Sequence, residues 1–137
     1  MGPLIDRIDI VCQLQRPSAR EMLKAKGGMS TSVMRDMVVT ATAFQSWRQS
    51  QMQDASSTVP ENEEPLTKFA RIIVENEFDD DAVRLIEDAM ERKNISMRGI
   101  ASSMRVARTI ADLDEQRRVG VDHVLEALTL RDESVAT

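Results

Sequence analysis

An amphipathic stretch at Asn94–Asp114 constrains the fold of this chain more than any other part of the sequence. Ser96 is suited to cap a helix, because its hydroxyl can accept a hydrogen bond from a backbone N–H of the first turn. Apolar residues then recur at helical spacing. The expected buried stripe comprises Ile100, Met104, Ala107 and Ala111, widened by Val106, Ile110 and Leu113. The sequence therefore predicts one long helix with a buried side.

A second line of residues on the same helix is polar. It comprises Arg98, Ser102, Arg105, Thr109 and Asp112, which also step by three or four residues. The two arginines of this line are one heptad apart, so they share a helix face. A solvated face is the simplest interpretation of such a line, and a binding surface is the alternative. Small residues are frequent on this helix and would let another helix or a ligand approach closely.

Composition favours a helical fold with an aliphatic core. Aromatic residues make up 3% of the chain, and Ala, Leu, Met, Glu and Arg are abundant. The nine methionines would serve as adaptable filler in the core. At 137 residues the chain corresponds to one domain with at most a short appendage. No apolar run approaches the roughly 20 residues of a membrane span, so we expect no membrane partner.

Charge and cysteine content restrict the function classes. The net charge of −5 and the pI near 4.9 argue against a free-standing, non-specific nucleic-acid binder. The single cysteine, Cys12, excludes an internal disulfide and fits a reducing, cytoplasmic compartment. We expect Cys12 to be a small buried hydrophobe. The single histidine, His123, has no cysteine or second histidine to complete a metal site, so no metal site is predicted.

The first part of the chain predicts a short strand. Ile10–Leu14 is rich in β-branched residues, and Pro17 ends the run. A single strand would leave its N–H and C=O groups without ladder partners. We therefore expect this strand to belong to a sheet formed by residues upstream of Met1, so that the sequence is part of a longer protein.

The rest of the chain predicts further helices. A long helix is expected at Val33–Met52, with a stripe made of Val33, Met37, Ala41 and Phe44. The polar, acidic stretch Gln53–Pro65 predicts an exposed loop. Shorter helices are expected at Leu66–Phe78, from the Asp79–Asp81 cap to Lys93, and at Val121–Arg131. In the last helix Val124, Leu125 and Leu128 should point inward.

Four segments of the sequence resemble a known family. Ser96–Arg98 (S-M-R) and Arg105–Leu113 (R-V-A-R-T-I-A-D-L) resemble the second sensor helix of AAA+ ATPases, and more narrowly that of the magnesium-chelatase-like YifB/ComM family. Val119–Leu128, with its V-D-H-V-L-E-A-L, is similar to the last helix of that family's C-terminal domain. Gly2–Ile10 (G-P-L-I-D-R-I-D-I) resembles the segment that leads into the last strand of its ATPase core. The resemblance covers 2–17 and 79–131, and it is poor between them.

The resemblance implies an all-α fold. We expect an AAA+ lid-type helical bundle of about four helices, preceded by a long helix and one residual core strand. The implied domains are 1–28 for the end of the AAA+ core, 29–65 for the long helix and acidic loop, 66–131 for the helical lid, and 132–137 for a polar tail.

The resemblance also implies roles for three arginines. Arg98 matches the arginine that reaches the γ-phosphate of bound ATP in AAA+ proteins of this type. Arg7, in L-I-D-R-I, matches an arginine finger that acts in trans in the neighbouring subunit, although an isoleucine follows it where the motif has an aromatic residue. An ion pair with Asp6 or Asp9 is the structural alternative for Arg7. Arg105 is a weaker candidate, because helix–helix ion pairs would explain it equally well.

The sequence contains no G-x-x-x-x-G-K-[ST] loop. Phosphoryl chemistry needs backbone amides around the phosphates, a lysine and a magnesium site, and we find none of these in the sequence. We therefore expect this fragment to be inactive alone, with no cofactor of its own. The full-length protein would use ATP and Mg²⁺ through an upstream AAA+ core and would assemble as a homo-oligomeric ring. Its lid would couple ATP binding and hydrolysis to remodelling, with DNA branch migration as one example and DNA bound through other parts.

Two other function classes stay open beside the lid of an ATPase. One is an independent helical protein-interaction module with a histone-like pairing fold, which the unpartnered strand weakens. The other is a helical nucleic-acid-binding module, which the acidic pI weakens. An upstream reading frame with Walker motifs would separate both from the lid.

Overall fold

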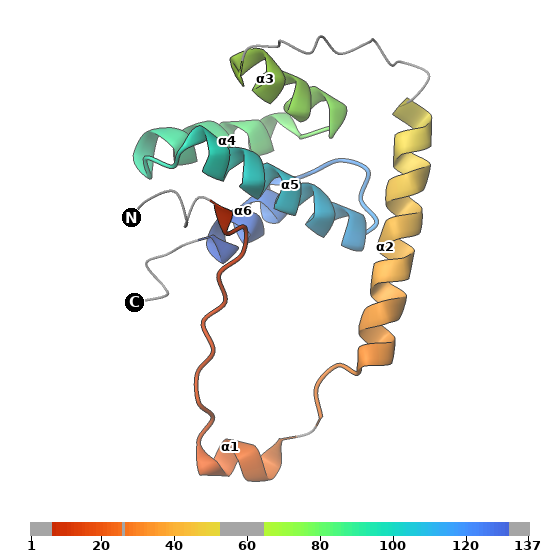
Figure 1. Ribbon diagram of the computed structural model, residues 1–137, viewed down its shortest axis with the longest axis vertical. Helices are drawn as coiled ribbons and strands as arrows, with labels where there is room; N and C mark the ends of the chain where they lie inside the picture. Colours follow the sequence, from red (N-terminus) through yellow and green to blue (C-terminus); the bar gives the residue numbers. More distant parts are fainter. Residues whose placement is uncertain (1–6, 26, 53–64, 132–137) are drawn as a thin grey trace.

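The computed structural model describes residues 7–25, 27–52 and 65–131. Within these ranges the chain is all-α, as predicted, and it forms the helices α1 (Ala19–Lys24), α2 (Thr31–Met52), α3 (Pro65–Glu75), α4 (Asp80–Arg92), α5 (Met97–Leu113) and α6 (Val121–Leu130). Figure 1 shows α3 to α6 gathered into a bundle, with α2 along one side. Residues 8–18 and α1 form an arm that extends from the bundle and carries α1 at its far end. None of the described helices is long and apolar enough to cross a membrane.

The hydrophobic core lies between α4, α5 and α6. Its buried members are mostly aliphatic, and they are Phe78, Ala82, Ile86, Ala89, Ile100, Met104, Ala107, Ala111, Val119, Val124, Ala127 and Leu128. Side chains of α3 that are partly buried, among them Phe69 and Ile72, pack against this core from outside. Burying one large aliphatic side chain stabilises a fold by about 1.5–3 kcal/mol, so this core accounts for the cohesion of the bundle.

The central helix α5 follows the predicted pattern. Ser96 caps it by accepting a hydrogen bond from the Gly99 N–H at 3.1 Å. The predicted stripe of Ile100, Met104, Ala107 and Ala111 is buried. The predicted widening of the stripe is wrong at Leu113, the last residue of α5, which is 43% exposed. Val106 and Ile110 are partly buried at the edge of the core.

The helices α4 and α6 begin side by side. Phe78 and Val119 form an isolated parallel bridge, in which the Asp79 N–H donates to the Val119 carbonyl at 2.9 Å. Asp79 occupies the N-cap position of α4 as predicted, but its side chain makes no capping hydrogen bond, and its carboxylate pairs with Arg118. In α6, Val124 and Leu128 are buried, whereas Leu125 is 52% exposed, so the prediction that it points inward is wrong.

The strand predicted at Ile10–Leu14 is not formed in the part of the chain that the structure describes. Residues 8–17 run without regular secondary structure, because no second strand among the described residues offers a ladder of hydrogen bonds. The Val11 N–H donates instead to the Leu130 carbonyl at 2.6 Å. The residual strand was therefore a wrong prediction, and so was the buried position of Cys12, which is exposed.

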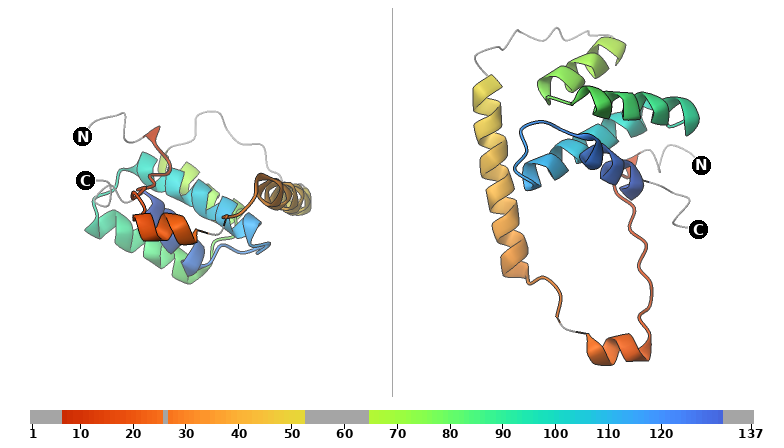
Figure 2. Two further views of the ribbon diagram at one scale, coloured as in Figure 1. Left: turned by 90° about the horizontal axis from the view of Figure 1, so that it is seen from below. Right: turned by 180° about the vertical axis from the view of Figure 1, so that it is seen from behind.

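The helix α2 touches the bundle only with its C-terminal part. It spans the predicted range, but Val33 and Met37 of its predicted stripe are exposed, and Ala41 and Phe44 are partly buried. Figure 2 shows the start of α2 extending away from the bundle beside the arm. The stripe prediction fails there because no described element lies against that half of α2. The predicted acidic loop falls, apart from Pro65, outside the described residues.

Candidate functional site

The first turn of α5 is joined to the N-terminal segment by Arg131. Arg131 follows α6, and its Nη1 donates a hydrogen bond to the backbone carbonyl of Ile8 at 2.7 Å. A Cβ atom at Gly99 would lie 3.0 Å from both Nε and Nη2 of Arg131 and 2.9 Å from Cγ2 of Ile95. The glycine therefore leaves the space through which the Arg131 guanidinium reaches Ile8.

Two further contacts hold the same segment. The Asp9 carboxylate accepts a short hydrogen bond from the Ser102 hydroxyl on α5. The Val11 N–H donates to the last carbonyl of α6, at Leu130. The segment thus crosses the N-terminal half of α5 and the end of α6. Arg7 is the first described residue of this segment, residues 7–11, and its backbone lies next to Ile8, which Arg131 holds beside the first turn of α5.

Arg98 and Arg7 are exposed at this end of the bundle. Arg98 is the second residue of α5, directly behind the Ser96 cap. Neither guanidinium has a hydrogen bond or an ion pair within the described ranges. The ion pair of Arg7 with Asp9 is not formed, since that carboxylate binds Ser102, and Asp6 lies outside the described residues. Each guanidinium is therefore accessible to an anion from solvent.

The residues of the polar line predicted on α5 differ in their exposure. Arg98, Arg105 and Thr109 are exposed, as a solvated or binding face requires. Ser102 and Asp112 are buried, so the prediction of a single polar face is wrong at these two positions. Each is covered by a residue far away in sequence. Arg105 makes no ion pair with any other described residue.

The carboxylate of Asp112 is the centre of a buried charge cluster that sequence reasoning did not find. It accepts from Arg48 of α2 at 3.1 and 3.2 Å and from Arg108 at 2.9 Å. The three residues are 3–5% exposed. Only the i, i+4 spacing of Arg108 and Asp112 was visible in the sequence. The pairing with Arg48 joins two helices whose contact no local pattern indicates.

The excess positive charge of this cluster is spread over backbone carbonyls. Arg108 donates to the carbonyls of Asn76 (2.7 Å), Gln116 (2.6 Å) and Arg117 (2.7 Å). Burial lowers the pKa of Arg108, and the neighbouring Asp112 carboxylate opposes this shift. Arginine stays protonated in proteins, so the cluster keeps its net positive charge. Its hydrogen bonds and ion pairs connect α2, α5 and the loops that flank the bundle.

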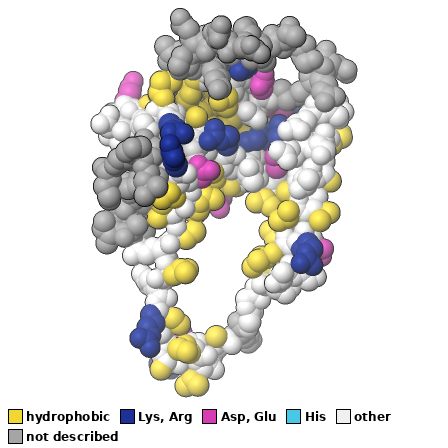
Figure 3. Space-filling model, in the orientation of Figure 1, with side chains coloured by type: hydrophobic (Ala, Val, Ile, Leu, Met, Phe, Trp, Pro, Cys, Tyr) yellow, Lys and Arg dark blue, Asp and Glu magenta, His cyan; other side chains and the backbone are white. Residues whose placement is uncertain are grey.

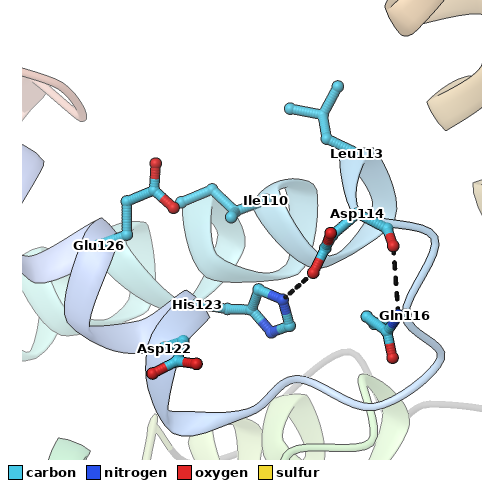
Figure 4. A pocket seen from close by; sticks show the side chains of 7 residues that line it. All are labelled: Ile110, Leu113, Asp114, Gln116, Asp122, His123 and Glu126. Atoms are coloured by element: carbon cyan, nitrogen blue, oxygen red, sulfur yellow. Dashed lines mark hydrogen bonds and ion pairs between the residues drawn. The ribbon is translucent and has the colours of Figure 1, made fainter.

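A hollow at the opposite end of α5 is separate from the arginines. It has a volume of about 570 Å³ and is lined by Ile110, Leu113, Asp114, Gln116, Asp122, His123 and Glu126. Figure 4 shows the His123 ring directed toward Asp114, to which Nε2 is bonded at 3.1 Å. The other ring nitrogen, Nδ1, accepts from the Gly120 N–H at 3.0 Å. Both nitrogens are engaged, and no group of acidic, histidine or cysteine side chains in the described parts of the chain could hold a metal ion.

Basic side chains are exposed on one face of the bundle. Figure 3 shows blue Lys and Arg side chains spread across one face of the bundle, above the arm. Yellow apolar side chains border the opening between the arm and the long helix. The exposed apolar residues of the arm and of α2 include Leu14, Leu23, Met34 and Val39.

Comparison with known proteins assigns the chain to a family. The family described as magnesium chelatase, subunit ChlI C-terminal, matches residues 28–131. An uncharacterized protein of Mycobacterium bovis and two of Mycobacterium tuberculosis are each 32% identical to this chain over 134 residues, which is 95% of this chain and 24% of theirs. The chain thus spans about a quarter of the length of these relatives. No solved structure matches it. By the family match, which covers most of its helices, the chain belongs to the magnesium-chelatase family and forms a C-terminal part of such a protein.

Proposed function

We propose that this chain is the lid of a ring-forming AAA+ ATPase of the YifB/ComM type, and that Arg98 senses the γ-phosphate of ATP. The observation that carries this proposal is the position of Arg98. It is exposed in the first turn of α5, unpaired among the described residues, and set in the S-M-R pattern of the sensor helix. The family membership supports the same assignment.

The chemistry of a guanidinium suits this role. Its planar fork can donate two parallel hydrogen bonds to phosphate oxygens. The backbone N–H groups at the start of α5 add partial positive charge, which favours an anion at the same end. Hydrolysis removes the γ-phosphate and with it the partner of Arg98. The orientation of the lid would then follow the state of the nucleotide.

The residues present fit only one end of an ATP–Mg²⁺ complex. Arg98 suits the terminal phosphate, whereas the described residues include no cluster of ligands for Mg²⁺. The metal and the rest of the nucleotide would therefore be bound by an upstream core of the same protein. Arg7 would act as an arginine finger in trans, which requires a homo-oligomeric ring. DNA branch migration in the cytoplasm is the remodelling activity that we propose for the whole protein.

The experiment compares this chain with the full-length protein. Isothermal titration calorimetry should detect ATP binding by the full-length protein and none by the 137-residue chain. Deleting 28–131 from the full-length protein should abolish turnover. Micromolar ATP binding by the 137-residue chain, or full turnover without 28–131, would contradict the proposal.

A second candidate function is a helical protein-interaction module. The observation that favours it is the exposure of large apolar side chains, such as Leu23 and Met34, on α1 and α2. Sedimentation equilibrium of the 137-residue chain tests this alternative. Self-association that Met34→Glu abolishes would favour the module, and a monomer at all concentrations would remove the pairing fold.

A further inference from the structure

We propose that Arg131 is a positioning residue that ties the segment carrying Arg7 to the helix carrying Arg98. The two arginines would then approach a nucleotide as one unit. This inference rests on the proposed function for its consequence, but the tie itself can be measured without ATP. Arg131 would touch neither the nucleotide nor the reacting atoms.

The first step of the argument is the path of the Arg131 side chain. It leaves the end of α6, passes the first turn of α5 at Gly99, and ends on the Ile8 carbonyl at 2.7 Å. Arg131 is 8% exposed, so its guanidinium is held by protein groups and largely removed from water. One side chain therefore contacts the residue next to Arg98 and the residue next to Arg7.

The second step is the presence of a glycine inside a helix. Gly99 is buried in the first turn of α5, where most residues would favour the helix more than glycine does. Its φ is not positive, so no special backbone conformation requires it. The close approach of two neighbours does, because a Cβ would lie 3.0 Å from two Arg131 nitrogens and 2.9 Å from Cγ2 of Ile95, which is tighter than ordinary packing. The glycine thus serves the path of the guanidinium.

The third step is that the segment is fixed at neighbouring points. Besides the Ile8 carbonyl, the Asp9 carboxylate is bonded to Ser102 and the Val11 N–H to Leu130. These contacts set both the direction and the distance at which the chain enters beside α5. A rotation of α5 that follows the loss of a phosphate from Arg98 would therefore be passed to Arg7 through the backbone.

The test uses the natural Cys12 as the attachment site of a spin label. Cys12 is exposed and is the only cysteine of the chain, and Thr109 is exposed on α5. Spin labels on Cys12 and on Thr109→Cys report the distance between the segment and the helix by pulsed electron paramagnetic resonance. The labelled 137-residue chain should give one narrow distance distribution.

Replacing Arg131 should loosen this distance. Arg131→Met keeps the apolar stem and removes the donors, so the distribution should become about twofold wider. Arg131→Lys should restore part of the narrow distribution, because it keeps one donor and the charge. Arg84→Met, at an exposed arginine of α4 with only a surface ion pair, is the matched control and should change nothing. An unchanged distribution in Arg131→Met would overturn the proposal.

A second variant covers the case in which Arg131→Met unfolds the chain. Gly99→Ala keeps Arg131 but places a Cβ in the path of its guanidinium. It should widen the distribution while helicity by circular dichroism stays unchanged. A narrow distribution in Gly99→Ala would overturn the role of the glycine and of the path.

Activity separates the failure of the tie from the failure of the lid. In the full-length protein, Arg7→Ala and Arg98→Ala together should lower turnover by no more than about threefold beyond the larger single loss, as expected of residues that act as a unit. Independent, multiplying losses would overturn the joint action. Suppose that the distance distribution widens in Arg131→Met but that Arg98→Ala leaves turnover unchanged. This result would support the tie and contradict the proposed function alone.

Discussion

Arg48 of α2 and Asp112 of α5 form a buried, bidentate ion pair between residues that are 64 positions apart in sequence. This pair explains why the C-terminal part of α2 lies against the bundle while its other half extends away. A buried carboxylate is stable only where cations and hydrogen bonds surround it. The pair therefore fixes α2 relative to the helix that carries Arg98.

The first prediction ranks two substitutions in this cluster. Asp112→Asn leaves Arg48 and Arg108 facing each other without a counter-charge, and it should lower the free energy of unfolding by about 3–5 kcal/mol. Arg48→Met should cost less, about 1–3 kcal/mol, since Asp112 keeps Arg108. Urea unfolding of the 137-residue chain measures both. Arg35→Met, at an exposed arginine of α2, is the control and should change little. A larger loss from Arg48→Met would contradict the central place of Asp112.

The second prediction uses the single tryptophan as a probe of α2. The Trp47 ring lies 5.6 Å from that of Phe44, and the Arg117 guanidinium is 6.0 Å above it. Detaching α2 removes Arg117 from the ring. The fluorescence emission of Trp47 should therefore shift to longer wavelength in Arg48→Met at a urea concentration where helicity is still complete. Simultaneous loss of both signals would mean that α2 and the bundle unfold together.

The third prediction locates the buried side of α5. Ala107 is fully buried, whereas Ile110 is only partly buried beside the hollow at the end of the helix. Ala107→Asp should therefore unfold the bundle, because an unpaired carboxylate in the core costs several kcal/mol against a total of about 5–15. Ile110→Asp should lower the thermal midpoint less. Circular dichroism melting curves test this, and the reverse order would show that the buried face is assigned wrongly.

The fourth prediction concerns the start of α6. The Nδ1 atom of His123 accepts from the Gly120 N–H, so the side chain satisfies a donor at the beginning of the helix. His123→Ala should lower the free energy of unfolding by about 0.5–2 kcal/mol, as the loss of a helix cap does. Glu126→Ala, one turn further along the same helix and exposed, is the matched control. Equal stability of His123→Ala and the parent chain would remove the capping role.

The elements that the sequence could predict are those decided by local patterns. The Ser96 cap and the stripe from Ile100 to Ala111 depend on residues within one helix, and both are found. The exposed positions of Leu113 and Leu125 were missed, because periodicity does not tell how wide the covering neighbour is. The strand at Ile10–Leu14 was predicted from its β-branched residues together with a partner sheet upstream of Met1, and none of the described residues supplies such a partner.

The contacts around the candidate site depend on pairs that are distant in sequence. Arg48 with Asp112, Arg131 with Ile8, and Asp9 with Ser102 each join separate elements, so no spacing rule could select them. In the sequence, Gly99 is only one of several small residues on its helix. Its position beside the Arg131 guanidinium required the three-dimensional structure.

The turnover of Arg98→Ala in the full-length protein tests the central claim most directly. A charge-assisted contact of a guanidinium with phosphate contributes about 2–3 kcal/mol. Its loss should lower ATP turnover by roughly 10- to 100-fold while the melting temperature stays unchanged. Arg98→Lys should restore part of the rate, because a point charge cannot form the bidentate fork.

Arg105→Ala is the internal control of the same measurement, since Arg105 is exposed further along the same helix and lies away from its first turn. It should lower turnover much less than Arg98→Ala does. Equal losses from both variants with a lowered melting temperature would make Arg98 a structural residue. Unchanged turnover in Arg98→Ala would contradict the γ-phosphate sensor.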